Sequence, residues 1–397
     1  MRSRMAWLAA LALAPAGAGA ADGSGSYVRP SFSVQGVSEH GSGAAFTVPG
    51  DDLDRALGVC LGAGLDGRGQ WADGAVDWSA FGFVNDPTPD GHGGLFAAAR
   101  ARGTDALGGA WRLRFDASGR VQRRETTTLS DFARSDLSMG LERQGRVTLG
   151  ARVGDRRRSA REDTLGFDRQ SLLVAATWGA PGGHRFRVEL GPQRAHARTA
   201  VGSRASGTVE WAARAGAWTT AVRATWLEPF GARRRDVSGG SFQAVLPTAF
   251  PAPTLPPPTL PPTPTVDPPA PDATVRAATP AEGLLGPALM VDPLEDDEND
   301  WDIGLRKQQL VFAATRAFGR ATVSAELRAD IERGPDLLSP TASTVARERL
   351  AARLTARRTL GPKWALLAQG GWQQLDDDRP GRGYSHGLVS FGVELRP

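Results

Sequence analysis

Arginine residues alternate with large apolar residues along parts of this 397-residue chain. Arg112 and Arg114, for example, alternate with Trp111, Leu113 and Phe115. In an extended strand successive side chains point to opposite faces, so this segment predicts one basic face and one apolar face. A surplus of bases on a low-dielectric wall raises the local concentration of anions. The chemistry that these residues favour is therefore the attraction of acidic solutes.

Histidine and aspartate offer a second kind of chemistry. The loop that precedes His386 contains Asp376, Asp377 and Asp378, so an acid–histidine hydrolytic arrangement is conceivable there. The sequence contains no serine–histidine motif of the kind that a lipase needs, no metal-ligand cluster and no phosphate-binding loop. It therefore predicts no catalytic residue, no metal site and no cofactor, and a hydrolase remains only as a third alternative.

The elements that would position the arginines are predicted to be two-sided strands. Residues 363–375 alternate between an apolar face, which includes Trp364 and Trp372, and a polar face, which includes Gln369 and Gln373. The two tryptophans are eight positions apart. At a rise of about 3.3 Å per residue and a tilt of about 45°, they are separated by roughly 19 Å along a membrane normal. This separation is close to the height of the apolar band on a transmembrane barrel.

The same spacing recurs in residues 217–228, where Trp218 and Trp226 are again eight positions apart on an apolar parity. Aromatic residues at the two edges of an apolar band form the girdles of outer-membrane barrels. The predicted girdle residues are Trp218, Trp226, Trp364 and Trp372.

The alternating segments predict an all-β fold, a transmembrane antiparallel up-and-down β-barrel of about 16 strands, with limits of 14 and 18. Short joints, such as residues 116–119, alternate with longer connections, such as residues 192–205, which is typical of periplasmic turns and external loops. The predicted strands are 55–65, 74–84, 93–101, 107–115, 120–128, 135–143, 146–156, 169–179, 183–191, 206–214, 217–228, 301–316, 320–332, 345–358, 363–375 and 384–395.

The N-terminal residues predict export. Residues 1–20 combine basic residues, a short apolar run and an Ala-Gly-Ala site, which is the pattern of a secretory signal peptide. No later window approaches 18 consecutive apolar residues, so a membrane protein of this sequence has to span as a closed barrel. The predicted location is the Gram-negative outer membrane, and the alternative is a large soluble secreted or periplasmic protein.

Two further segments have a composition of their own. Residues 21–54 are rich in Gly and Ser and contain extended pieces at 27–37 and 44–48, so they are predicted to be a lead-in or an extra hairpin before a barrel over 55–397. Residues 229–300 are rich in proline and end in an acidic run, which predicts a long external loop outside the sheet. This loop is either simply solvated or a ligand or cation site at the pore mouth.

The predicted inward parity carries more arginines than acids. A barrel of about sixteen strands is too wide for its side chains to fill, so this face is predicted to surround water. The same residues also fit Arg–Glu ladders that only brace the wall. The predicted pore-lining residues are Arg112, Arg114, Arg146, Arg152, Arg185, Arg187, Arg328, Arg349, Arg353 and Glu326.

Three segments resemble barrels that are associated with exopolysaccharide export. They are Ser26–Gln35 and the hairpin segments 306–325 and 357–366. The resemblance implies an outer-membrane barrel of the monomeric type that passes or anchors a secreted polysaccharide, and it implies no catalytic residue.

The sequence thus predicts a porin-like channel for polar, anionic solutes or a secreted polysaccharide. The alternative is a non-conducting structural or adhesive barrel that binds through its Pro-rich loop. The expected partners are outer-membrane lipid, the barrel-assembly machinery and a small anionic solute or polysaccharide. The formal net charge of +4 comes from a base supply that is nearly all arginine, and no nucleic-acid partner is predicted from it.

Overall fold

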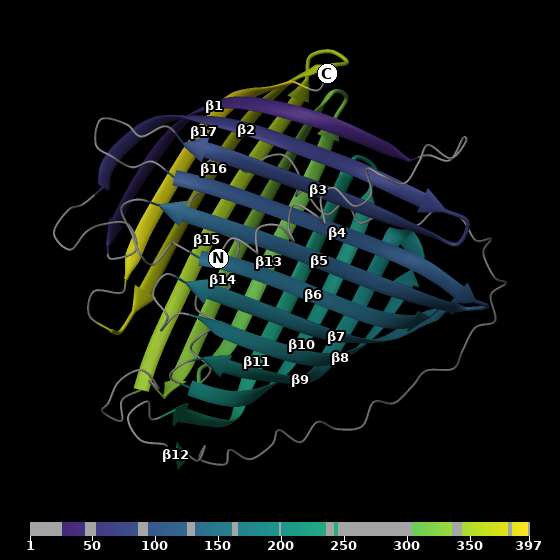
Figure 1. The fold of residues 1–397 in the computed structure, drawn as a ribbon, viewed down its shortest axis with the longest axis vertical. Helices are drawn as coiled ribbons and strands as arrows, with labels where there is room; N and C mark the ends of the chain where they lie inside the picture. The colour runs from purple at the N-terminus through teal and green to yellow at the C-terminus, as the bar shows by residue number, and fades with distance from the viewer. Residues whose placement is uncertain are drawn as a thin grey trace.

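The fold was taken from a computed structural model, in which one antiparallel β-sheet curves round and closes on itself (Figure 1). The structure describes residues 26–43, 53–85, 94–124, 132–160, 166–197, 200–235, 242–244, 304–335, 344–379 and 383–395. Among these residues, no helix is long and apolar enough to cross a membrane.

Neighbouring strands in the chain are neighbours in the sheet, and the barrel closes where β1 pairs with both β2 and β17. In Figure 1 the purple β1 lies beside the yellow β17. The strands are β1 (Tyr27–Gly43), β2 (Leu53–Trp71), β3 (Gly74–Asn85), β4 (Gly94–Gly108), β5 (Trp111–Arg124), β6 (Phe132–Arg143), β7 (Val147–Ala160), β8 (Phe167–Ala180), β9 (His184–Ala197), β10 (Ala200–Ala215), β11 (Trp218–Arg235), β12 (Phe242–Ala244), β13 (Arg306–Phe318), β14 (Ala321–Pro335), β15 (Thr344–Thr359), β16 (Trp364–Asp377) and β17 (Tyr384–Leu395).

The closed wall has 16 strands, because the three-residue β12 pairs only with the end of β11, while β11 pairs directly with β13. The predicted all-β antiparallel barrel of about 16 strands is therefore confirmed. β1 belongs to the wall as a single strand, and the boundary predicted at residue 55 falls inside β2.

The turn predicted at residues 116–119 is wrong, and so is the separate strand predicted at 120–128. Residues 111–124 form one strand, β5, and the chain turns earlier, where Gly108 and Gly109 have φ values of +101° and +58°. Glycine reaches this left-handed region without the steric cost of a Cβ. Asp116 lies in the middle of β5, and its carboxylate accepts a hydrogen bond from Arg102 at 2.7 Å. The polar residues that favoured a turn are inward-facing residues of the wall.

Strands joined by short connections meet at one end of the barrel, which we call the short-turn end; the other is the long-loop end. The predicted long connection at 192–205 is wrong, because β9 runs to Ala197 and β10 begins at Ala200. Most of the Pro-rich and acidic segment 229–300 lies outside the described residues, although 229–235 belong to β11. The predicted signal peptide also lies outside them.

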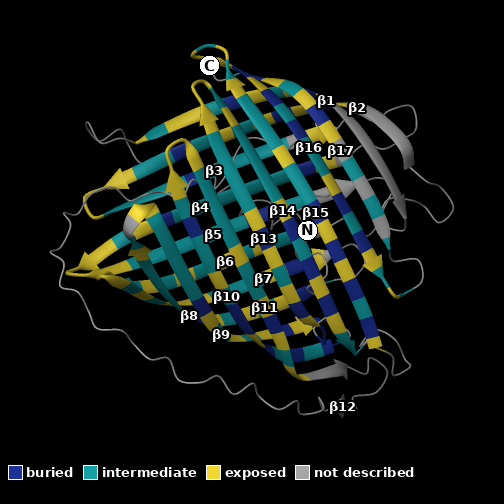
Figure 2. Cartoon of the chain, turned by 180° about the vertical axis from the view of Figure 1, so that it is seen from behind, coloured by how far each residue is buried: buried dark blue, intermediate teal, exposed yellow. Residues whose placement is uncertain are grey.

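The outer face of the barrel is apolar. Large aliphatic and aromatic side chains on the outward parity of every wall strand are exposed, and exposure alternates along the strands (Figure 2). Trp218, Trp226, Trp364 and Trp372 all point outward and are between 39% and 50% exposed. A closed barrel with an outward apolar belt leaves no backbone hydrogen-bonding group unpaired in lipid. The fold is that of a bacterial outer-membrane β-barrel, and we place the protein in that membrane.

Glycines on the outer face provide space for aromatic rings on the neighbouring strand. Gly207 of β10 lies opposite Trp226 of β11, and a Cβ added at Gly207 would overlap the indole ring. Gly103 and Phe115 form a second pair of this kind, between β4 and β5. The position of Trp226 on the wall therefore depends on the missing side chain at Gly207.

We expect Gly207→Val to destabilise the folded barrel by about 1–3 kcal/mol, because the added branches force the Trp226 ring out of its packed position. Urea unfolding in detergent micelles, followed by tryptophan fluorescence, measures this change. Gly361→Ala is the matched control, because nothing lies within 4 Å of a Cβ added there. Equal midpoints for the two variants would contradict the role given to Gly207.

Candidate functional site

The inner face of the wall is polar and rich in cations. The strand registers place basic side chains on the inward parity of most strands, and these outnumber the inward acids. The inward cations include Arg100, Arg102, Arg112, Arg114, Arg120, Arg134, Arg152, Arg156, Arg158, Arg169, Arg185, Arg187, Arg204, Arg223, Lys307, Arg328, Arg347, Arg349, Arg353 and Arg357. The inward acids include Asp116, Asp136, Glu142, Glu189, Glu210, Glu326, Asp330, Glu332, Asp377 and Glu394.

On the inner wall of β4–β9, which we call the first sector, one carboxylate is shared by two arginines. Asp116 binds Arg100 at 3.2 Å and Arg102 at 2.7 Å. Each such group carries one net positive charge, because two guanidiniums face one carboxylate. The shared acid fixes the direction of both arginines without neutralising them.

The same arrangement recurs along the first sector. Glu189 of β9 binds Arg152 at 2.5 Å and Arg187 at 2.8 Å. Asp136 likewise binds Arg134 and Arg156, closer to the long-loop end. Near the short-turn end, Arg114 pairs with Glu142 at 3.2 Å, and Arg185 is close enough to both to interact electrostatically. Positive charge therefore follows the first sector from one end of the barrel to the other.

The inner wall of β13–β17, the second sector, has acid-centred groups that are buried. Asp330 receives a forked contact from Arg328, with Nε–Oδ1 at 3.0 Å and Nη2–Oδ2 at 2.6 Å, and it lies 3.9 Å from Arg349. Glu332 binds Lys307 at 3.3 Å and also binds Arg347. Each acid again holds two cations, but these side chains are 8% exposed or less.

The arginines that bind Asp116 and Glu189 differ in access to water from the cations that bind Asp330 and Glu332. Arg100, Arg102 and Arg152 of the first sector have side chains that are 32%, 37% and 43% exposed. Arg328 and Asp330 of the second sector are each 1% exposed. A solute in the lumen can therefore meet the guanidiniums of the first sector, whereas the buried groups of the second sector brace the wall.

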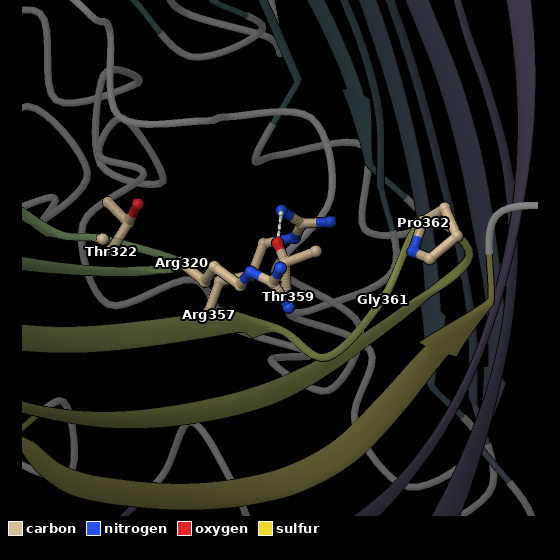
Figure 3. Close-up of a pocket in the computed structure, with 7 residues that line it drawn as sticks. Arg320, Thr322, Arg357, Thr359, Gly361 and Pro362 are labelled. Atoms are coloured by element: carbon tan, nitrogen blue, oxygen red, sulfur yellow. Dashed lines mark hydrogen bonds between the residues drawn. The ribbon is translucent and has the colours of Figure 1, made fainter.

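A cavity of about 510 Å³ lies at the short-turn end, between the joint of β13 and β14 and the joint of β15 and β16 (Figure 3). Arg357 lies beside it, with Nε donating to Glu394 at 3.0 Å and Nη1 donating to Thr359 Oγ1 at 3.5 Å. The residues that line the cavity are Gly319, Arg320, Thr322, Arg357, Thr359, Gly361 and Pro362.

The structure places most of the predicted pore-lining residues on the inner wall. The exception is Arg146, which lies in the short joint between β6 and β7 at the mouth of the barrel. Arg328 and Arg349 point inward but are only 3% exposed, so they do not face open water. Arg353 pairs with Glu326 at 3.7 Å in the second sector. The residues on the inner wall and accessible to solvent are Arg112, Arg114, Arg152, Arg185, Arg187, Arg353 and Glu326.

Sequence reasoning missed several members of these groups. Arg100, Arg102 and Asp136 were not among the predicted pore-lining residues: Arg102 lies beyond the end of the predicted strand 93–101, whereas Arg100 and Asp136 lie inside the predicted strands 93–101 and 135–143. The signal was present: the spacing of two that joins Arg112 and Arg114 continues through Asp116, and the same spacing joins Arg100 and Arg102 on β4.

The described residues contain no group of three or more His, Cys, Asp or Glu that could hold a metal ion. The side chain of His386 lies outside what the structure describes, so the hydrolytic arrangement with Asp376, Asp377 and Asp378 stays a prediction. His184 is described, and it accepts a hydrogen bond at Nδ1 from Trp211 at 3.2 Å. Cys60 is buried on the inward parity of β2.

No protein-family model matches the chain, and no curated protein matches it either. Similar solved structures include OccK2 (OpdF) of Pseudomonas aeruginosa in complex with glucuronate, at 10% identity, covering 93% of this chain and 98% of that chain, with a TM-score of 0.45. A BenF-like porin of Pseudomonas fluorescens Pf-5 is 9% identical, the match covers 94% of this chain and 99% of that chain, and the TM-score is 0.46. OpdK of Pseudomonas aeruginosa with vanillate is 8% identical, the match covers 93% of this chain and 99% of that chain, and the TM-score is 0.46. At these values the function has to follow from the residues of this chain.

Proposed function

We propose that this barrel is an outer-membrane channel for small anionic solutes, which pass along the first sector of the inner wall. The observation that supports the proposal is the sharing of one carboxylate by two arginines, seen at Asp116, Asp136 and Glu189. Such a group is held rigidly and keeps a net positive charge. A wall of groups of this kind attracts anions and repels cations.

The acids have a structural role in this proposal. An arginine side chain loses rotamer entropy when it is fixed, and a hydrogen-bonded carboxylate offsets that loss. Without Glu189, Arg152 and Arg187 would repel each other across the wall. The two functions considered for the arginines, bracing and attraction, are therefore carried by the same groups in the first sector.

The exposure of the first sector makes it the side of the lumen that a solute contacts. Arg152 and Arg114 have side chains that are 43% and 42% exposed, so their N–H groups can exchange water for the carboxylate or phosphate of a solute. The free energy gained at each contact between the solute and an arginine is modest, because the arginines are hydrated. This suits a channel, in which binding has to be strong enough for entry and weak enough for exit.

The experiment that tests the proposal is a reversal-potential measurement. The purified full-length barrel is inserted into planar lipid bilayers, and a KCl gradient is applied across the membrane. We expect open channels whose reversal potential has the sign of chloride permeation, with a preference that weakens as the salt concentration rises, because salt screens exposed charges. A barrel that favours potassium, or that carries no current, would refute the proposal.

The non-conducting alternative predicts no current in the same bilayer. Its adhesive form depends on the Pro-rich segment, most of which lies outside the described residues. Passage of a secreted polysaccharide also stays a prediction, and blockage of the chloride current by an acidic oligosaccharide, but not by a neutral one of equal length, would support it.

A further inference from the structure

One arginine of the barrel differs from all those of the inner wall. Arg316 of β13 points outward near the short-turn end, directly opposite Trp218 of β11. Its guanidinium carbon lies 4.9 Å from the ring centroid of Trp218 and 4.4 Å from that of Phe318, which follows two residues later on the same face. Contact with two aromatic faces holds the guanidinium in one place on the outer surface.

Arg316 has no acidic neighbour on this part of the wall. The sequence contains no Asp or Glu in residues 211–227, 304–325 or 349–375, which contain the short-turn ends of β10, β11, β13, β14, β15 and β16. Within the described residues, Nε of Arg316 is buried and makes no hydrogen bond. The guanidinium is therefore held by aromatic contacts, and no acid on this part of the wall balances its charge.

Two other cations lie on the outer surface at this end of the barrel. Arg358 of β15 points outward opposite Ala321, which in turn lies opposite Phe318. Lys363, in the joint between β15 and β16, is exposed. The outer surface of β13–β16 at this end therefore carries positive charge with no acid within the described residues to balance it.

We propose that Arg316 binds the phosphate headgroup of an anionic phospholipid in the membrane leaflet at the short-turn end, and that Arg358, two strands away, adds to the attraction. The headgroup level of a membrane is marked by aromatic girdles, and Trp218 and Trp364 lie there, exposed on the outer face. Phosphate oxygens accept the charge-assisted hydrogen bonds that the two Nη groups of Arg316 can donate. Cations near an anionic lipid surface add further attraction.

This site lies on the opposite face of the wall from the lumen. It does not depend on whether the channel conducts or which ions it prefers, and a failure of either proposal leaves the other intact. It also gives the expected lipid partner of the barrel a specific position.

The test compares lipid retention by the purified full-length barrel. Barrels are reconstituted in nanodiscs of phosphatidylcholine that contain increasing fractions of phosphatidylglycerol and are then released into mild detergent, and the bound lipids are counted by native mass spectrometry. We expect the wild type to retain phosphatidylglycerol selectively. Arg316→Gln should weaken this retention by about tenfold, the loss expected for a hydrogen-bonded charged contact. Arg316→Lys, which keeps the charge but loses the paired Nη donors, should be intermediate.

Arg333→Gln is the matched control. Arg333 also points outward, but it lies near the long-loop end, pairs with Glu348 at 3.7 Å and has a side chain that is 68% exposed. We expect it to retain phosphatidylglycerol like the wild type. Equal losses in both variants, or an unchanged Arg316→Gln protein that migrates as a folded barrel on unheated gels, would overturn the site.

A second arm separates the lipid from free phosphate. Inorganic phosphate is added to the detergent-solubilised wild type at increasing concentration. We expect phosphatidylglycerol to remain bound, because its acyl chains also contact the apolar belt beside Trp218. Displacement of the lipid by millimolar phosphate would show a small-anion site instead and would overturn the assignment to lipid.

Discussion

Replacement of both Arg100 and Arg102 by glutamate should reverse the ion preference of the channel. The two arginines share Asp116, at 3.2 and 2.7 Å, and both are partly exposed to the lumen. In the variant three carboxylates would face the same part of the lumen, where one net positive charge stood before. A cleft lined by charges of one sign changes the local concentration of ions by tenfold or more. We therefore expect the permeability ratio of chloride to potassium to fall by about tenfold and to cross unity.

The measurement is the reversal potential in planar bilayers under a fixed KCl gradient. A double replacement by glutamine is the intermediate variant, which removes the positive charge without reversing it and should give a smaller shift. Arg157→Glu is the matched control, because Arg157 points outward, pairs with Asp155 and is 67% exposed. If the glutamate variant has the same permeability ratio of chloride to potassium as the wild type, the first sector does not control selectivity.

The fold was largely predictable because the barrel repeats one local rule. Every wall strand alternates an outward apolar side chain with an inward small or polar one, and this pattern needs no knowledge of the partner strand. Residues 384–395, for example, were predicted as a strand, and β17 has the same bounds. The strand ends were predicted less well, because the polar ends of strands such as β9 and β10 have the composition of a loop.

The error at residues 116–119 has a specific physical cause. Asp, Ser and Gly favour turns when they are judged by local propensity. In β5, however, Asp116 is fixed by two arginines on the neighbouring strand β4, and the turn falls at Gly108 and Gly109, where the φ values are positive. Tertiary ion pairs override the local preference, and no pattern within β5 reveals them.

The inward direction of the arginines was predictable from parity, but their grouping was not. Asp330 and Arg328 are two residues apart on one strand, whereas Arg349 reaches Asp330 only because the register of β14 and β15 places them opposite each other. Register depends on the joint between two strands, which the sequence left uncertain by a few residues. The burial of these groups was equally hidden, because parity says which face a side chain occupies and not what covers it.

The buried group around Asp330 gives the largest expected effect on stability. Arg328 holds Asp330 by a forked contact, Arg349 lies 3.9 Å away, and the three side chains are 1–3% exposed. Removal of the carboxylate by Asp330→Ala would leave two guanidiniums buried in the wall without their shared acid. Breaking a buried ion pair by removing one partner costs about 3–5 kcal/mol, because the remaining charge has lost its compensation.

We therefore expect Asp330→Ala to lower the free energy of unfolding by about 3–5 kcal/mol, measured by urea unfolding of the barrel in lipid vesicles with tryptophan fluorescence as the signal. Glu348→Ala is the control, because Glu348 and Arg333 form an exposed pair on the outer face, where an ion pair contributes about 0–1 kcal/mol. The double variant Arg328→Met and Asp330→Leu should recover much of the loss, since apolar side chains of similar volume need no compensating charge. An Asp330→Ala barrel as stable as the Glu348→Ala barrel would mean that water reaches the second sector. In that case the groups around Asp330 and Glu332 would contact the solute, as the groups of the first sector do.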